Sequence, residues 1–291
     1  MLRSLLFCPA DSPSKMERAA ASAADAVILD LEDAVAPERK RAARLAAAAF
    51  LNARAGRPGP ALWVRINPLS TPLAAEDVAT VAPESPAGIV LPKPRSANDV
   101  EALSRLLDRV ETASRLPAGG IRILPIAAET PRSLFRLDSY LEAGPRMSAL
   151  TWGGEDLSGA VGSAGVRGPD GALFDLFRVA RALCLAVAAA RDVPAIETVW
   201  TAFRDREGLE AHAAQARREG FAGMLAIHPD QLEVINRVFT PSEAELDEAR
   251  RLVALFEASH GAAALAFDGR MVDVAHLKRA RRLLRLNLPP A

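Results

Sequence analysis

Two carboxylates near the ends of neighbouring predicted strands are the side chains in this chain best suited to metal chemistry. Glu129 ends the run PIAAE, and Asp156 follows the run TWGGE. Carboxylate oxygens with room for water and substrate oxygens suit Mg²⁺, which keeps several of its waters in proteins. We therefore expect Glu129 and Asp156 to be metal ligands. In a structural alternative, Glu129 caps the following helix and Asp156 pairs with Arg167 or Lys93.

Basic and acidic residues also end three other predicted strands. Arg65 in VRINP offers a fixed guanidinium fork to a carboxylate or an enolate oxygen, and Lys93 in VLPKP adds positive potential for an anionic substrate. Asp30, Glu32 and Asp33 form an acidic cluster. We predict that Glu32 and Asp33 contact the substrate, and that at least one member of the cluster only holds Arg65 by a salt bridge.

Eight apolar runs of strand length must position these side chains. The runs alternate with helical stretches rich in Ala, Leu, Arg and Glu, which is typical of repeated βα units. In a parallel (β/α)₈ barrel the strand C-termini converge on one face, so charges far apart in sequence become neighbours. The sequence therefore predicts an α/β fold of the TIM (β/α)₈ barrel type. The expected strands are residues 5–10, 26–33, 61–67, 88–93, 121–129, 148–155, 194–200 and 223–229.

The chain continues beyond the eighth predicted strand with two helices and a glycine-containing segment. We expect residues 1–240 to form the catalytic barrel and residues 241–291 to form a C-terminal helical extension and lid. A turn at the DG pair could bring Asp268 or Asp273 over the mouth of its own barrel or of a neighbouring one. The alternative is a hairpin that stabilises an oligomer.

Charge and composition exclude several classes of partner. The 291 residues contain 36 Lys+Arg and 36 Asp+Glu, so no global charge favours nucleic acid or an anionic membrane. Charged residues interrupt every apolar stretch before the roughly 18 residues that a membrane helix needs. The first residues do not resemble a signal peptide, so we expect a cytoplasmic protein. Cys8 and Cys184 have no metal-like spacing and are expected to be small buried residues.

Eight short motifs occur in an order typical of one known family. They are FCPADSP, AVILDLEDAV, VRIN, GIVLPK, an ET pair after PIAA, GGEDL, IHPDQ and DGRMVD. With them the chain resembles the citrate lyase β-subunit-like branch of the HpcH/HpaI aldolase superfamily, from Leu6 to about Arg282. Relatives in that branch include malyl-CoA and citramalyl-CoA lyases. The resemblance implies a TIM barrel that assembles as a homotrimer or hexamer, needs Mg²⁺, and cleaves or forms a carbon–carbon bond beside a CoA thioester.

The resemblance also implies roles for individual residues. Glu129 and Asp156 match the two metal ligands, and Glu129 is expected to lie against the substrate as well. Arg65 matches the arginine that contacts the substrate oxygens. Asp273 in GRMVDV matches the aspartate that lyase members place over a neighbouring subunit's metal as an acid/base, although Ala275 stands where the motif usually has proline.

Other positions concern the thioester. Lys15 and Arg18 match the neighbourhood that meets CoA phosphates, and their alternative is ordinary charge on a helix surface. Met224 and Leu225 stand where a lysine or arginine usually precedes AIHP, and residues 158–161 replace an acidic residue that often follows GGEDL. We therefore expect CoA binding to be weakened or arranged differently.

These observations predict an Mg²⁺-dependent lyase with Arg65 and Asp273 as catalytic residues. Its substrate would be a 3-hydroxyacyl-CoA such as malyl-CoA or citramalyl-CoA, and its products an acyl-CoA and a 2-oxo acid. Three alternatives remain open. The protein could be a malyl-CoA thioesterase, or a citrate lyase β subunit that acts with α and γ subunits on the citryl thioester of an acyl carrier protein. It could also be a catalytically weak barrel that binds a ligand or serves in assembly.

Overall fold

The structure is a computed structural model that describes residues 2–259 and 263–286. Eight parallel strands form a closed barrel in sequence order, because β8 pairs with β1 as well as with β7. The predicted TIM barrel is therefore confirmed. The strands are β1 Ser4–Pro9, β2 Ala26–Asp30, β3 Ala61–Arg65, β4 Gly88–Leu91, β5 Arg122–Ala128, β6 Leu150–Trp152, β7 Ala195–Glu197 and β8 Gly223–Ala226.

The second strand is shorter than the predicted residues 26–33. It ends at Asp30, whose carboxylate accepts hydrogen bonds from the backbone N–H groups of Glu32 at 2.9 Å and Ala34 at 3.1 Å. A short acidic side chain that binds the backbone two and four residues further on favours a turn over a continued strand. Glu32 and Asp33 consequently lie on the loop after β2.

The sixth strand also ends earlier than the predicted residues 148–155. It stops at Trp152, and Gly154 is already the first residue of helix α6, Gly154–Val161. Asp156 therefore lies in the first turn of a helix, where the N-terminal backbone N–H groups favour negative charge.

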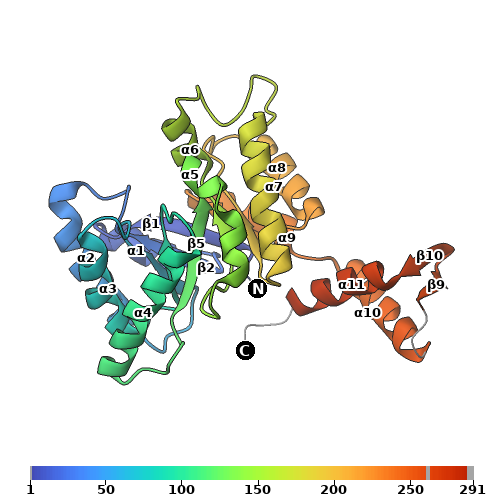
Figure 1. The fold of residues 1–291 in the computed structure, drawn as a ribbon, viewed down its shortest axis with the longest axis horizontal. Helices are drawn as coiled ribbons and strands as arrows, with labels where there is room; N and C mark the ends of the chain where they lie inside the picture. The colour runs from blue at the N-terminus through green and yellow to red at the C-terminus, as the bar shows by residue number, and fades with distance from the viewer. Residues whose placement is uncertain (1, 260–262, 287–291) are drawn as a thin grey trace. The chain divides into compact units, whose positions relative to one another are not determined.

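Helices cover the outside of the barrel. In α4, buried Val100, Leu103 and Leu107 recur every three or four residues and form the inner face, while the side chain of Ser96 caps the helix by accepting the N–H of Asn98. Figure 1 shows α2, α3 and α4 side by side on one flank of the strands. The helices are α1 Pro13–Ala20, α2 Lys40–Arg54, α3 Leu73–Val81, α4 Ala97–Ser114, α5 Pro131–Leu134, α7 Asp175–Ala190 and α8 Arg206–Glu219. Short 3₁₀ turns are η1 Pro37–Arg39, η2 Ala82–Glu84, η3 Leu137–Glu142 and η4 Pro229–Gln231.

Large side chains fill the barrel interior. A buried cluster includes Ile28, Trp63, Leu124 and Leu225, each from a different strand. Gly88 lies opposite Trp63 in the β3–β4 register, and a Cβ atom at Gly88 would come within 2.2 Å of the Trp63 ring. The glycine thus makes room for the indole. The interior is a packed core and not a pore, so chemistry is confined to the ends of the strands.

A second compact unit begins at Arg237, within helix α9, Leu232–Phe239, whereas the barrel unit spans Leu2–Asn236. The expected boundary lay after residue 240. The second unit contains α10 Glu243–Ala258, β9 Ala264–Phe267, β10 Arg270–Asp273 and α11 Val274–Leu286. Residues 260–262 and 287–291 of the predicted extension lie outside the described residues.

The second unit has its own small core. β9 and β10 pair as an antiparallel hairpin, and both turn residues, Asp268 and Gly269, have positive φ angles of 45° and 75°. Such a pair is typical of the tight turns that join two strands. Leu252 and Phe256 from α10 pack with Phe267 of the hairpin in one apolar cluster. A role of this unit as a lid stays a prediction.

Two expectations from composition concern the protein as a whole. None of the helices in the described parts of the chain is long and apolar enough to span a membrane. Cys8 and Cys184 are buried free thiols, as predicted. Burial raises the pKa of the Cys8 thiol to about 11, so the thiol is protonated and unreactive near neutral pH.

Candidate active site at the barrel mouth

Arg65 and Asp30 form a fixed pair at the carboxyl ends of β3 and β2. They are direct partners in the strand register, and the Arg65 Nε and Nη2 atoms donate to the two Asp30 oxygens at 2.7 and 2.6 Å. The guanidinium also lies 4.8 Å over the ring of Phe7. Burial alone would lower the pKa of Arg65, but Asp30 and the other nearby carboxylates raise it. Asp30 is thus the member of the acidic cluster that holds Arg65 by two hydrogen bonds.

Glu32 lies between two cations. One carboxylate oxygen is 3.0 Å from Nη1 of Arg65, and the other is 2.6 Å from Nζ of Lys93. Burial raises the pKa of Glu32, while both cations oppose the rise. The oxygen near Arg65 has no hydrogen-bond partner among the described residues, so the contact of Glu32 with substrate stays a prediction. Asp33 has an exposed side chain and is 3.1 Å from Lys93 Nζ, so it remains open to a ligand.

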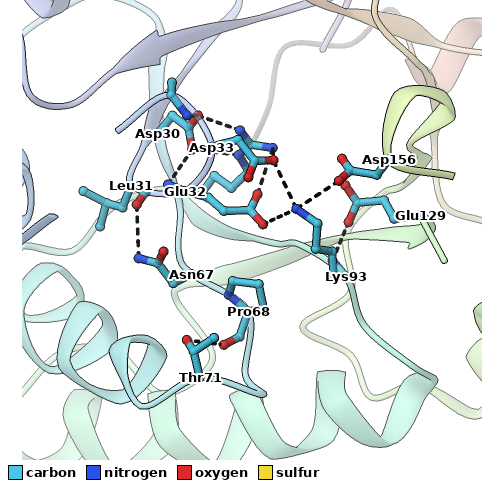
Figure 2. A network of polar contacts seen from close by, with 12 residues as sticks. Asp30, Leu31, Glu32, Asp33, Asn67, Pro68, Thr71, Lys93, Glu129 and Asp156 are labelled. Carbon is cyan, nitrogen blue, oxygen red and sulfur yellow. Dashed lines mark hydrogen bonds and ion pairs between the residues drawn. The ribbon is translucent and has the colours of Figure 1, made fainter. Parts of the chain in front are cut away.

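Glu129 and Asp156 lie close together on neighbouring elements. Glu129 directly follows β5, is only 2% exposed, and accepts the backbone N–H of Lys93 with one carboxylate oxygen. Burial, and then the negative charge of Asp156, raise the pKa of Glu129 well above its ordinary value. Asp156 is 31% exposed and lies 3.0 Å from Lys93 Nζ. Figure 2 shows Lys93 between these two carboxylates and the pair Glu32 and Asp33.

Glu129 and Asp156 each had a structural alternative to metal binding, and the two alternatives have different outcomes. Thr130, and not Glu129, caps α5, because its side chain accepts the N–H of Ser133. The pairing of Asp156 with Lys93 is present. Glu129 is therefore a buried carboxylate without a helix-capping role, which is costly unless another positive group offsets its charge.

Gly153 allows Glu129 to occupy its position. A Cβ atom on Gly153 would lie 2.4 Å from Cγ of Glu129 and 3.0 Å from one of its oxygens. Any other residue at this position would force the side chain of Glu129 to move. Gly153 therefore leaves the space that the predicted metal ligand Glu129 occupies.

The donor set fits a hard divalent cation. Among the described residues no group of three or more His, Cys, Asp and Glu side chains is arranged as a ready metal cluster. Glu129 and Asp156 would therefore supply two carboxylates and leave further positions to water and substrate, as Mg²⁺ prefers. In the wider network five carboxylates surround two cations, Arg65 and Lys93. This concentration of carboxyl groups would also favour a bound cation.

Three further predicted residues are not members of this network. Lys15 and Arg18 are exposed on α1, and neither side chain has a hydrogen bond or ion pair within the described part of the chain. Because α1 follows the carboxyl end of β1, its first turn is on the side of the mouth. Asp273 belongs to the second compact unit.

Asp273 has a partner that the sequence did not reveal. Its Oδ1 atom accepts the backbone N–H of Ala275 at 2.9 Å and lies 2.7 Å from Nδ1 of His276. The hydrogen bond from His276 is the main cause of the lowered pKa of Asp273. Asp273 directly precedes α11, and His276 follows it by three residues. This spacing is typical of side chains that pair at the start of a helix and could have indicated the pair.

Glu197 is another buried carboxylate at a strand end, and it was not among the site residues predicted from the sequence. Glu197 is the last residue of β7, is fully buried, and accepts hydrogen bonds from Trp152 Nε1 at 2.7 Å and Arg181 Nε at 2.6 Å. Nearby His212 has its pKa lowered to about 3, by burial and by Arg167 and Arg181. The strand-end criterion that selected Glu129 would also have selected Glu197 in PAIET. Its contacts make it a structural residue that supports the mouth.

The fold and the site together define a class: a (β/α)₈ barrel protein with an acidic, cation-ready mouth and one fixed arginine. The amino-acid sequence assigns the chain to one family within this class. The chain belongs to the HpcH/HpaI aldolase/citrate lyase family, whose sequence model matches residues 3–229. The resemblance inferred from the motifs is thereby confirmed.

Three relatives illustrate the range of the family. The (3S)-malyl-CoA thioesterase of Cereibacter sphaeroides is 35% identical over 286 residues, covering 97% of this chain and 93% of the relative. The L-malyl-CoA/beta-methylmalyl-CoA lyase of the same species is 33% identical over 307 residues, again covering 97% and 93%. The crystal structure of CitE from Mycobacterium tuberculosis in complex with magnesium, acetoacetate and coenzyme A matches with a TM-score of 0.77 and 34% identity, covering 98% of this chain and 97% of that chain.

Proposed function

We propose that the barrel mouth cleaves or forms a carbon–carbon bond in a 3-hydroxyacyl-CoA thioester such as malyl-CoA or citramalyl-CoA. The products of cleavage are an acyl-CoA and a 2-oxo acid. The observation that carries the proposal is the buried Glu129 beside Asp156, within one network with the fixed guanidinium of Arg65. The solved relative in complex with magnesium, acetoacetate and coenzyme A supports a divalent metal and a CoA-derived ligand for this chain.

Glu129 and Asp156 would hold Mg²⁺ through their carboxylate oxygens. The ion would supply positive charge to the carboxylate and hydroxyl oxygens of the substrate. Because Glu129 is held by Gly153 on one side and by the Lys93 N–H on the other, its position is fixed before the substrate arrives. Preorganised groups of this kind lower a barrier without reorganising during the reaction.

Arg65 stabilises the charge that develops on the thioester. When the carbon–carbon bond breaks, its electron pair moves onto the thioester as an enolate, and the substrate hydroxyl loses its proton to become the carbonyl of the 2-oxo acid. Two of the five N–H donors of Arg65 bind Asp30 and Nη1 also pairs with Glu32, so the enolate oxygen would take a donor that these contacts leave over. Asp273 from a second subunit, which its lowered pKa leaves ionised, would take the proton of the hydroxyl group and then return it to the enolate carbon.

The direct test is product analysis with purified protein, Mg²⁺ and malyl-CoA. The proposal predicts equal amounts of acetyl-CoA and glyoxylate, and loss of turnover when a chelator removes the metal. Addition of Mg²⁺ should restore the rate. Turnover that continues in excess chelator would contradict the metal role of Glu129 and Asp156.

A thioesterase is the second candidate, because a relative with 35% identity bears that name. Hydrolysis would give free CoA and malate, so the same assay separates the two reactions by their products. A mixture of both product pairs would show that cleavage and hydrolysis compete for malyl-CoA at one mouth.

The remaining alternatives give distinct outcomes in this assay. Activity that requires an added acyl carrier protein with citryl thioester would identify a citrate lyase β subunit acting with α and γ partners. Binding of Mg²⁺ and thioester without turnover would indicate a ligand-binding or assembly component. We further propose a homotrimer or hexamer located in the cytoplasm, and sedimentation measurements would test the assembly.

A further inference from the structure

Lys93 contacts both predicted metal ligands. Its backbone N–H donates to Glu129, and its ammonium group lies 3.0 Å from Asp156. The same ammonium is 2.6 Å from Glu32 and 3.1 Å from Asp33. An ammonium group has three N–H donors, so the three carboxylates account for all of them. Figure 2 shows Lys93 at the centre of this arrangement.

The backbone at Lys93 is held in an unusual conformation. Its φ angle is +49°, in the left-handed region that costs a residue with a side chain about 1 kcal/mol or more. Pro92 and Pro94 flank it and have no N–H, so the Lys93 N–H is the only backbone donor in this three-residue segment. The conformation directs that donor toward Glu129 while the side chain reaches Asp156.

We propose that Lys93 is a substrate-binding residue that competes with the divalent cation for Asp156 and, once the cation is bound, contacts the anionic substrate. Without metal, the ammonium neutralises part of the charge on Asp156. When Asp156 turns to a metal, one N–H donor of Lys93 is released while Glu32 and Asp33 keep the ammonium in place. The released donor faces the mouth and binds a carboxylate oxygen of the 2-oxo acid. This inference rests on the proposed function, since it assumes metal binding at Glu129 and Asp156.

The proposal predicts opposite effects on two ligands. Replacing Lys93 with Met keeps the length of the side chain and the backbone N–H but removes the competing charge. Mg²⁺ alone should then bind about tenfold more tightly in calorimetry, because one positive charge near the site is gone. The 2-oxo acid glyoxylate should bind the Mg²⁺-loaded variant about tenfold more weakly. A purely structural lysine would not produce effects of opposite sign.

Two variants serve as matched controls. Lys93→Arg keeps the positive charge, so its Mg²⁺ affinity should stay within about threefold of the wild type. Lys40 also binds the loop after β2, with its ammonium 2.9 Å from the carbonyl oxygens of both Leu31 and Glu32, but it does not contact Asp156. Lys40→Met should leave both affinities unchanged. If Lys93→Met does not fold, Lys93→Gln tests the same loss of charge while keeping N–H donors.

The outcomes separate this inference from the proposed function. Unchanged or weaker Mg²⁺ binding in folded Lys93→Met, with normal metal-dependent turnover in the wild type, overturns the role of Lys93 alone. Absence of Mg²⁺ binding and turnover in the wild type overturns the proposed function itself. Tighter Mg²⁺ binding together with weaker glyoxylate binding supports both.

Discussion

The position of Glu129 depends on the absence of a side chain at Gly153. In Gly153→Ala the new methyl group would lie 2.4 Å from Glu129 Cγ and force the carboxylate to move. We predict that Mg²⁺ affinity falls at least about tenfold and that the free energy of unfolding falls by about 1–3 kcal/mol. Calorimetry and chemical denaturation measure the two effects.

The control lies in the same helix region. A Cβ atom on Gly159 in α6 meets nothing within 4 Å. Gly159→Ala should therefore keep the wild-type Mg²⁺ affinity and stabilise the protein slightly, because alanine favours a helix. Equal Mg²⁺ affinity in both alanine variants would show that Gly153 does not position a metal ligand.

The planar guanidinium group of Arg65 leads to a second prediction about a single residue. Lysine at this position keeps the positive charge but cannot bind both Asp30 oxygens and an enolate oxygen in one plane. We predict that Arg65→Lys lowers kcat by about 100-fold or more, while Mg²⁺ affinity changes little. Steady-state kinetics at saturating metal measures the loss.

Arg3 and Asp25 form a similar arginine–carboxylate pair away from the mouth, which serves as the control for Arg65→Lys. The Nε and Nη2 atoms of Arg3 bind the two oxygens of Asp25 at 2.9 and 2.7 Å, just before β1 begins. Arg3→Lys should therefore retain turnover. A similar loss in both variants would mean that Arg65 acts through stability and not through the substrate.

At the scale of elements, Glu111 joins helix α4 to the segment that enters β5. It is 2% exposed, and its carboxylate accepts hydrogen bonds from the N–H groups of Gly119 at 2.8 Å and Ile121 at 3.0 Å. Arg146 donates to both carboxylate oxygens. Mainly because of Arg146, the pKa of Glu111 is lowered from its ordinary value of 4.5 to about 2.

This lowered pKa predicts a dependence of stability on pH. Because the folded pKa lies below the unfolded one, ionised Glu111 stabilises the fold above about pH 4.5, and the contribution is lost as pH falls toward about 2. We predict that Glu111→Gln lowers the free energy of unfolding at pH 7 by about 2 kcal/mol and flattens its decline in that acid range. Denaturation curves at several pH values measure both.

Asp108 is the matched control, since it also pairs with Arg146 but has a side chain that is 59% exposed. Asp108→Asn should change stability by less than about 1 kcal/mol, because solvent screens an exposed pair. If the two variants lose equal stability, the buried contacts of Glu111 are not what connects α4 to β5.

At the scale of the whole molecule, the resemblance implies that Asp273 acts in a neighbouring subunit. Asp273→Ala should then lose nearly all turnover while it retains Mg²⁺ binding, and Glu129→Gln should lose both. If the two inactive variants are mixed and reassembled, about one quarter of the sites should contain an intact Glu129 and an intact Asp273 from a neighbour. Turnover recovered to about that level would be measured after unfolding and joint refolding.

The control mixes each variant only with itself, which should give no recovery. Activity that stays absent in the mixed sample, although mixed oligomers form, would contradict an acid/base contributed by a second subunit. The metal site of Glu129 and Asp156 would not be affected by that result.

The sequence by itself determined the fold class and which candidate site residues lie at the strand ends. Apolar runs separated by amphipathic helices lead to a closed barrel, because each run buries both faces and each helix buries one. The strand ends then bring Asp30, Arg65, Lys93 and Glu129 to one face. The capture of Arg65 by one acidic neighbour also followed from charge alone.

Only the tertiary structure decided which of these groups bind one another. Hydrogen bonds require distances near 3 Å, which depend on strand register, on where each strand ends, and on local backbone angles. The register places Asp30 opposite Arg65, and the positive φ of Lys93 directs one residue to both Glu129 and Asp156. Spacing along the chain carries no such information, because it fixes the order of the charges but not their separation in space.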